Sequence, residues 1–143
     1  MFELFNAEIS VIGLVLAAIV NMLIGMLWFS PSFLGKKWLQ LVNKSADDLQ
    51  AMPLDYVLSI IRSLLVALGL NIFISYTVNS WAQSTSVVSI SVFVGFIAWL
   101  SFVAMGSLNP VIWEGRRKQL YAFNMMHELV STISMAIVVG LTI

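Results

Sequence analysis

The sequence contains no cysteine and few charged residues. Without cysteine, the chain cannot form a disulfide, use a thiol in catalysis or bind a metal through sulfur. Charged residues make up 10% of the 143 positions, against about a quarter in soluble domains, and 60% are hydrophobic. The mean hydropathy is +0.97, which is typical of an integral membrane protein. Seven bases balance seven acids, so the net charge indicates no nucleic-acid partner, and we expect none.

Catalytic and metal-binding signatures are also missing. The sequence contains no G-x-S-x-G, no H-E-x-x-H and no P-loop. His127 is the only histidine, so it cannot form a convincing metal site by itself. We therefore expect a protein that is not an enzyme and that holds neither a metal nor a cofactor.

Four apolar runs are each about the 20 residues that a transmembrane helix needs. They predict one all-α transmembrane domain over residues 1–143, a four-helix bundle with helices at about 9–29, 54–78, 87–108 and 120–142. The first eight residues lack the basic region of a signal peptide, so we expect the first run to be retained. Between the first two helices, residues 32–52 are either a short amphipathic segment lying at the membrane interface or a connecting loop.

Two patterns refine this architecture. Small residues and one asparagine recur every fourth position in the first helix, at Gly13, Ala17, Asn21 and Gly25, which predicts close packing against another helix. Ser45 and Asp48 have the spacing of a helix cap.

The bases are distributed unevenly over the loops. Six of the seven lie in the first and third loops: Lys36, Lys37, Lys44, Arg116, Arg117 and Lys118. The positive-inside rule therefore predicts that these loops lie in the cytoplasm and that both termini lie outside it. The same bases either bind lipid headgroups or only set the topology.

The seventh base, Arg62, lies inside an apolar run, where an unpaired charge is costly. At a rise of about 1.5 Å per residue, Arg62 lies roughly 12 Å from the end of its helix that faces the basic loops. Counting from that end places polar residues of the other helices at a similar depth: Asn21, Trp99 or Ser101, Asn124, His127 and Glu128. The count predicts an intramembrane polar layer in which Arg62 pairs with Glu128 between the second and fourth helices. Asn21, Asn124 and Ser131 are the candidates to satisfy the remaining polar groups.

This layer permits two interpretations. A paired arginine and glutamate can be a structural ion pair that fixes the helix register. Intramembrane ionisable groups can also form a site for protons, ions or a substrate, with His127 as the group that titrates nearest neutral pH. A layer sealed from water favours the first interpretation, and a layer that a wetted cavity reaches favours the second.

The motifs resemble a known family. Trp28-Phe29-Ser30-Pro31 followed by Gly35-Lys36-Lys37-Trp38 resembles the opening of the bacterial membrane proteins catalogued as domain of unknown function 1761. The second half resembles that family through Gly95-Phe96, Asn109, Glu114-Gly115-Arg116 and His127-x-Leu129-Val130-Ser131. Phe29 stands where the family usually has tyrosine, and Met126 stands where we expect an aromatic residue. The resemblance implies a four-helix protein of the bacterial inner membrane and supplies no activity.

Two functions agree with this sequence. The first is an oligomeric carrier or channel that uses the Arg62, His127 and Glu128 layer, with copies packed through small-residue faces such as Gly13, Ala17, Asn21 and Gly25. The second is a non-catalytic accessory or scaffold subunit that binds lipids or other membrane proteins. The expected partners are accordingly the lipid bilayer, further copies of the chain or other membrane proteins.

Overall fold

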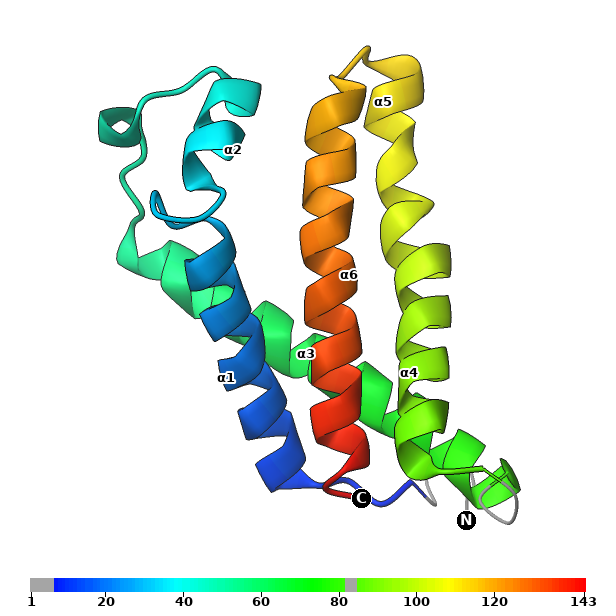
Figure 1. Ribbon diagram of the computed structural model, residues 1–143. Coiled ribbons are helices and arrows are strands. Elements are labelled where there is room, and N and C mark those ends of the chain that lie inside the picture. The colour runs from blue at the N-terminus through cyan, green and yellow to red at the C-terminus, as the bar shows by residue number, and fades with distance from the viewer. Residues whose placement is uncertain (1–6, 82–84) are drawn as a thin grey trace.

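The computed structural model describes residues 7–81 and 85–143, and every regular element within them is a helix. Four helical stretches are long and apolar enough to cross a membrane: α1 (Val11–Trp28), α3 (Pro53–Trp81), a third over Val87–Trp113, and α6 (Lys118–Gly140) (Figure 1). The all-α class and the four long helices are therefore confirmed. The predicted bounds of the first, second and fourth helices differ from the observed ones by at most three residues.

The third helix is irregular and extends beyond its predicted end at residue 108. It consists of α4 (Val87–Ala98), a π-helical turn η3 (Trp99–Ala104), a 3-10 turn η4 (Gly106–Leu108) and α5 (Asn109–Trp113). The predicted end was wrong because Pro110 lies in the first turn of α5, where a helix needs no N–H donor.

The first loop contains two short helices, α2 (Gly35–Val42) and η2 (Ala46–Asp48). α2 ends at Asn43, whose left-handed backbone conformation (φ 56°) lets its N–H bond the carbonyls of the last turn. At η2, the Asp48 carboxylate accepts hydrogen bonds from the hydroxyl and the backbone N–H of Ser45, at 2.7 and 2.8 Å. These bonds confirm the predicted cap and lower the pKa of Asp48 below its usual value.

The first and third loops lie at the same end of the molecule. α2 packs against α6, and Arg117 Nη1 donates to the Leu41 carbonyl oxygen at 3.5 Å. Figure 1 places α2 and α5 at the top and the C-terminus at the bottom. We call the end that carries α2 and residues 114–117 the basic end, because it holds the six loop bases.

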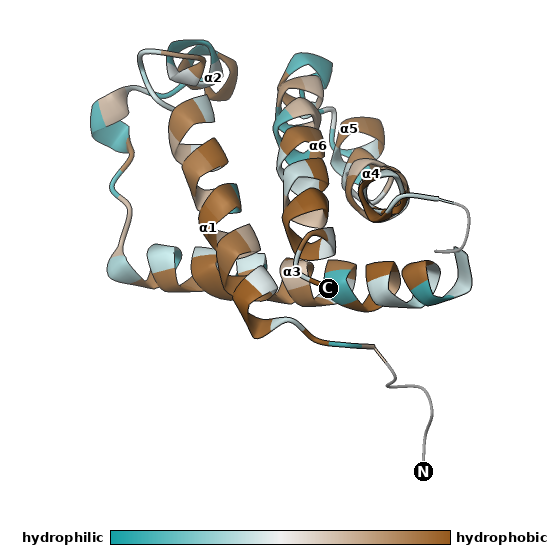
Figure 2. Cartoon of the chain, turned by 60° about the horizontal axis from the view of Figure 1, so that its bottom comes forward, coloured by the Kyte–Doolittle hydropathy of each residue, from teal (hydrophilic) through white to brown (hydrophobic). Residues whose placement is uncertain are grey.

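α6 is the central helix, because it packs against α1, α3 and α4. α3 crosses the other long helices obliquely and lies behind them in Figure 1 and across their base in Figure 2. Their shared core lies in the half of the molecule away from the basic end. Its fully buried apolar side chains are Ala17, Ala67, Leu70, Ile74, Ile90, Met135, Ala136 and Val139.

The small-residue face of α1 is used within the chain. Gly13 lies so close to Thr142, which follows α6, that a Cβ would collide with the threonine hydroxyl. Ala17 is fully buried, and Gly25 faces His127. The predicted close packing is thus present, but the idea that this face joins copies of the chain was wrong because α3 and α6 already cover it.

The outer surface of the long helices is apolar. Many large hydrophobic side chains on α1, α3 and α4 are exposed, including Ile12, Leu65 and Phe93. Figure 2 shows hydrophobic residues along the lengths of these helices and hydrophilic residues mostly at their ends. An apolar exterior of this kind suits contact with lipid tails and indicates a membrane protein.

Candidate functional site

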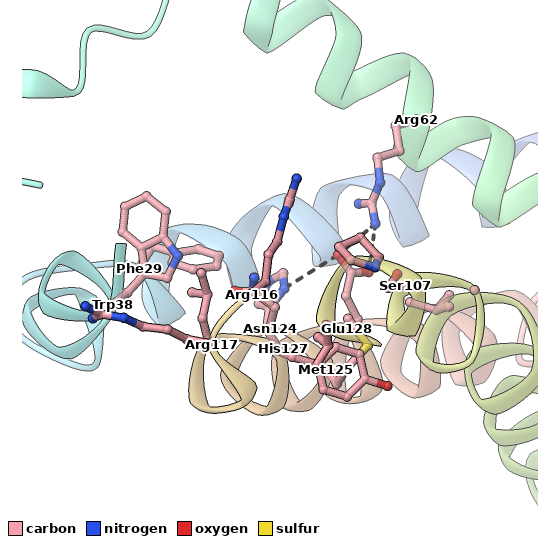
Figure 3. Close-up of a pocket in the computed structure, with 16 residues that line it drawn as sticks. Phe29, Trp38, Arg62, Ser107, Arg116, Arg117, Asn124, Met125, His127 and Glu128 are labelled. Carbon is pink, nitrogen blue, oxygen red and sulfur yellow. Dashed lines mark hydrogen bonds and ion pairs between the residues drawn. The ribbon is translucent and has the colours of Figure 1, made fainter. Parts of the chain in front are cut away.

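The site is built around Arg62 of α3 and Glu128 of α6. Nη2 of Arg62 donates to both carboxylate oxygens of Glu128, each at 2.7 Å. The contact predicted by the depth count is therefore present (Figure 3). Arg62 and Glu128 lie about equally far along α3 and α6 from the first residues of these helices, Pro53 and Lys118.

The ion pair is not sealed inside the protein. The Arg62 side chain is 52% exposed and that of Glu128 is 20% exposed. Both line a cavity of about 680 Å³ that extends to the basic end. Within the described residues, only Nη2 of the guanidinium has a hydrogen-bond acceptor. An arginine held in this way has donors left for a further acceptor.

His127 is buried beside the pair and contacts α1. Its ring centre lies 4.9 Å from that of Phe29 and 5.7 Å from that of Trp28. Nδ1 is 3.9 Å from a carboxylate oxygen of Glu128, and Nε2 is 3.5 Å from the Ser131 hydroxyl. The histidine thus links the ion pair to the aromatic end of α1. No group of three potential metal ligands occurs in residues 7–81 and 85–143.

Two predicted members of the layer have other partners. Asn21 donates to the Ser63 hydroxyl at 2.7 Å rather than serving the Arg62–Glu128 pair. Ser63 follows Arg62 on α3 and is therefore turned about 100° from it, so it faces α1 while Arg62 faces α6. Trp99 donates from Nε1 to the Met125 carbonyl oxygen at 3.0 Å. Neither of these two residues lines the cavity, whereas Arg62, Asn124, His127 and Glu128 share it.

Two loop arginines belong to the same cavity. Arg116 and Arg117 line it, although the distribution of bases over the loops predicts for them only a role in topology or in binding lipid headgroups. Their side chains lie near Phe29 and Trp38 in Figure 3. Lys36 and Lys118 do not line this cavity, and Lys37 lines a separate one of about 650 Å³ between α2 and α6.

The irregular part of the third helix forms one wall of the cavity. Val103, Gly106 and Pro110 line it. The Tyr121 hydroxyl donates to the Ala104 carbonyl oxygen at 2.7 Å, which provides that group with a partner where the helix departs from α geometry. Irregular backbone at membrane depth is tolerated where it lines a cavity, and π-helical turns are frequent at functional sites.

Sequence reasoning missed the aromatic part of the site. Phe29, Trp38 and Tyr121 line the cavity, and the rings of Phe29 and Trp38 meet edge to face at 5.3 Å. The available signal was the concentration of aromatic residues near the ends of the predicted helices on the basic side. Aromatic residues near helix ends more commonly anchor a protein at the membrane interface, so this signal does not by itself indicate a cavity.

These features define a class of protein: a small helical membrane protein with four potential spans and a cavity at one end that reaches an intramembrane ion pair. The chain belongs to the family described as "Protein of unknown function (DUF1761)", whose model matches residues 12–140. No curated protein and no solved structure matches the chain.

Proposed function

We propose that the protein is a carrier of the bacterial inner membrane, with its basic end in the cytoplasm. The observation that carries the proposal is the cavity of about 680 Å³ that reaches the Arg62–Glu128 pair. A pair with only a structural role needs no access from outside the protein. The six loop bases at the open end support the cytoplasmic orientation.

A carrier agrees with the geometry better than a channel does. Beyond the ion pair, the buried side chains of Ala17, Ala67, Ile74, Met135 and Val139 close the other half of the molecule. An open cavity on one side and a packed core on the other are expected for one state of an alternating-access cycle. If the protein forms oligomers, they use surfaces other than the small-residue face of α1, which is covered within the chain.

The ion pair suggests how the cycle works. A substrate group that binds Arg62 would compete with Glu128 for the same guanidinium. Return of the Glu128 carboxylate to Arg62 would then help to release the substrate. In this scheme both residues bind and release a ligand, and no covalent chemistry is required.

A flux assay tests the proposal. We expect liposomes containing the wild-type protein to swell faster than protein-free liposomes in isosmotic potassium benzenesulfonate with valinomycin present. Glu128→Gln should reduce the swelling rate about tenfold or more, to the protein-free level, because substrate release loses its competing carboxylate. Asp47→Asn is the matched control, since Asp47 is an exposed carboxylate near the same end that does not line the cavity. Equal flux from wild type and Glu128→Gln would refute the carrier role.

An accessory or scaffold role is the alternative, and the second cavity favours it. That cavity lies between α2 and α6 and combines Trp28, Phe123 and Leu41 with Lys37 and two glutamines. An apolar groove with a basic rim suits a lipid or another membrane protein. Co-purification of a partner in mild detergent, together with absence of flux in the liposome assay, would favour this role.

A further inference from the structure

The charges around the cavity indicate the kind of ligand that it accepts. Among the described residues, three guanidinium groups line it, those of Arg62, Arg116 and Arg117, but only one carboxylate does, that of Glu128. Arg116 pairs with Glu114 at 3.0 Å, where both side chains are more than half exposed, so this ion pair is weak. Within residues 7–81 and 85–143, Arg117 makes only the long hydrogen bond to the Leu41 carbonyl oxygen. The cavity therefore carries a surplus of positive charge.

The positive charges lie in two regions of the cavity. Arg62 lies at the inner end of the cavity, between α3 and α6, and the two loop arginines lie where the cavity meets the basic end. Guanidinium groups bind carboxylates, sulfonates and phosphates through paired N–H donors. Arg116 and Arg117 would thus attract an anion, and Arg62 would hold its acidic group.

The remaining walls of the cavity favour a ligand with an apolar part. Phe29, Trp38 and Tyr121 contribute aromatic rings, and Val103, Val111 and Leu120 contribute aliphatic side chains. A volume of about 680 Å³ lies within the range of small-molecule sites. Inorganic phosphate would leave most of these walls without contact, whereas an aromatic or alkyl anion would cover them.

We propose that the cavity binds an amphiphilic anion whose acidic group takes the place of the Glu128 carboxylate on Arg62 and whose apolar body packs against Phe29, Trp38 and Tyr121. This inference deepens the proposed carrier function by naming the class of its substrate, and it rests on the same cavity. Two sources share this chemistry: a free organic anion and the acidic headgroup region of an anionic phospholipid.

Binding to the purified protein tests the inference independently of flux. The protein is placed in nanodiscs of phosphatidylcholine and titrated by calorimetry with benzenesulfonate, with benzyltrimethylammonium as the cation and with benzyl alcohol as the neutral compound. We expect saturable binding of benzenesulfonate alone. Arg62→Gln should weaken it about tenfold or more, because a charge-assisted hydrogen bond is lost.

Glu128→Gln gives the most discriminating result. Removing the competing carboxylate should strengthen benzenesulfonate binding about tenfold, and the slower release that this implies agrees with the expected loss of flux. A structural role for Glu128 would weaken binding instead. Lys118→Gln removes a base at the same end that does not line the cavity and should leave the affinity unchanged. The Arg62→Gln/Glu128→Gln double variant keeps a hydrogen-bonding pair of neutral side chains between α3 and α6. A double variant that folds but does not bind benzenesulfonate would show that Arg62→Gln loses binding because the guanidinium is missing and not because the protein unfolds.

The lipid arm repeats the titration in nanodiscs that contain phosphatidylglycerol. Binding of benzenesulfonate that phosphatidylglycerol does not reduce identifies a free anion as the ligand. Competition between benzenesulfonate and phosphatidylglycerol identifies the lipid as the ligand. Retention of phosphatidylglycerol by the wild-type protein but not by Arg62→Gln identifies it as well. Equal binding of the cation or the neutral compound, or binding that Arg62→Gln does not change, would overturn the inference. Binding without flux would refute the carrier role alone, and flux without anion selectivity would refute this inference alone.

Discussion

Replacing Arg62 with leucine is expected to destabilise the protein by about 1–3 kcal/mol, and replacing Glu128 with leucine as well should recover most of that loss. The single change leaves the Glu128 carboxylate, only 20% exposed, without its cationic partner. The expected cost is lower than for a fully buried pair because Arg62 is half-exposed to the cavity. The double change removes both charges and leaves apolar side chains between two packed helices.

The measurement is a double-mutant cycle of thermal unfolding in one detergent, with Arg62→Leu, Glu128→Leu and the double variant. Lys118→Leu is the control, since Lys118 is exposed and forms no ion pair within the described residues. Additive losses would show that the two charges do not stabilise one another. In that case, the 2.7 Å contacts would contribute nothing measurable to the fold.

Replacing Asn71 with leucine is expected to stabilise the protein by about 1–3 kcal/mol. Asn71 is fully buried on α3, and neither its amide nitrogen nor its amide oxygen has a hydrogen-bond partner in the described residues. Leucine has the same branched skeleton and removes both unsatisfied groups. An increase in the midpoint of thermal unfolding would be the direct observation.

Asn79→Leu is the matched control, because Asn79 lies exposed near the end of the same helix and should change stability little. A loss of stability in Asn71→Leu as large as that of a cavity-creating substitution would contradict the account. If the stabilised variant also loses flux in the liposome assay, Asn71 contributes to the transport cycle, since natural cores retain unsatisfied polar groups mainly where function requires them.

The parts of the structure that follow from helix geometry could be predicted from the sequence. Hydropathy located the spans, and the fixed rise of a helix placed Arg62 and Glu128 at one depth. The cost of an unpaired intramembrane charge then identified them as partners. These arguments need only the distance along each helix, which a sequence contains.

The parts that depend on helix rotation and crossing could not be predicted in the same way. The depth count placed Asn21 near Arg62 but could not show that Ser63 turns toward α1 to accept its hydrogen bond. Nor did it reveal the oblique course of α3 (Figure 1) or the cavity that Arg62 lines. Pro110 was read as the end of a helix because its place in a new first turn depends on the irregular backbone before it.

The proposed function requires that the Arg62–Glu128 pair lie at the inner end of a cavity that reaches the basic end. Because the natural chain has no cysteine, single cysteines can test it directly with a membrane-impermeant sulfonate thiol reagent. Asn124→Cys, inside the cavity, should react from the same side of the membrane as the reference Lys118→Cys, while the buried Ser131→Cys should not react from either side. An unreactive Asn124→Cys, or equal reaction of Asn124→Cys and Ser131→Cys, would contradict the account.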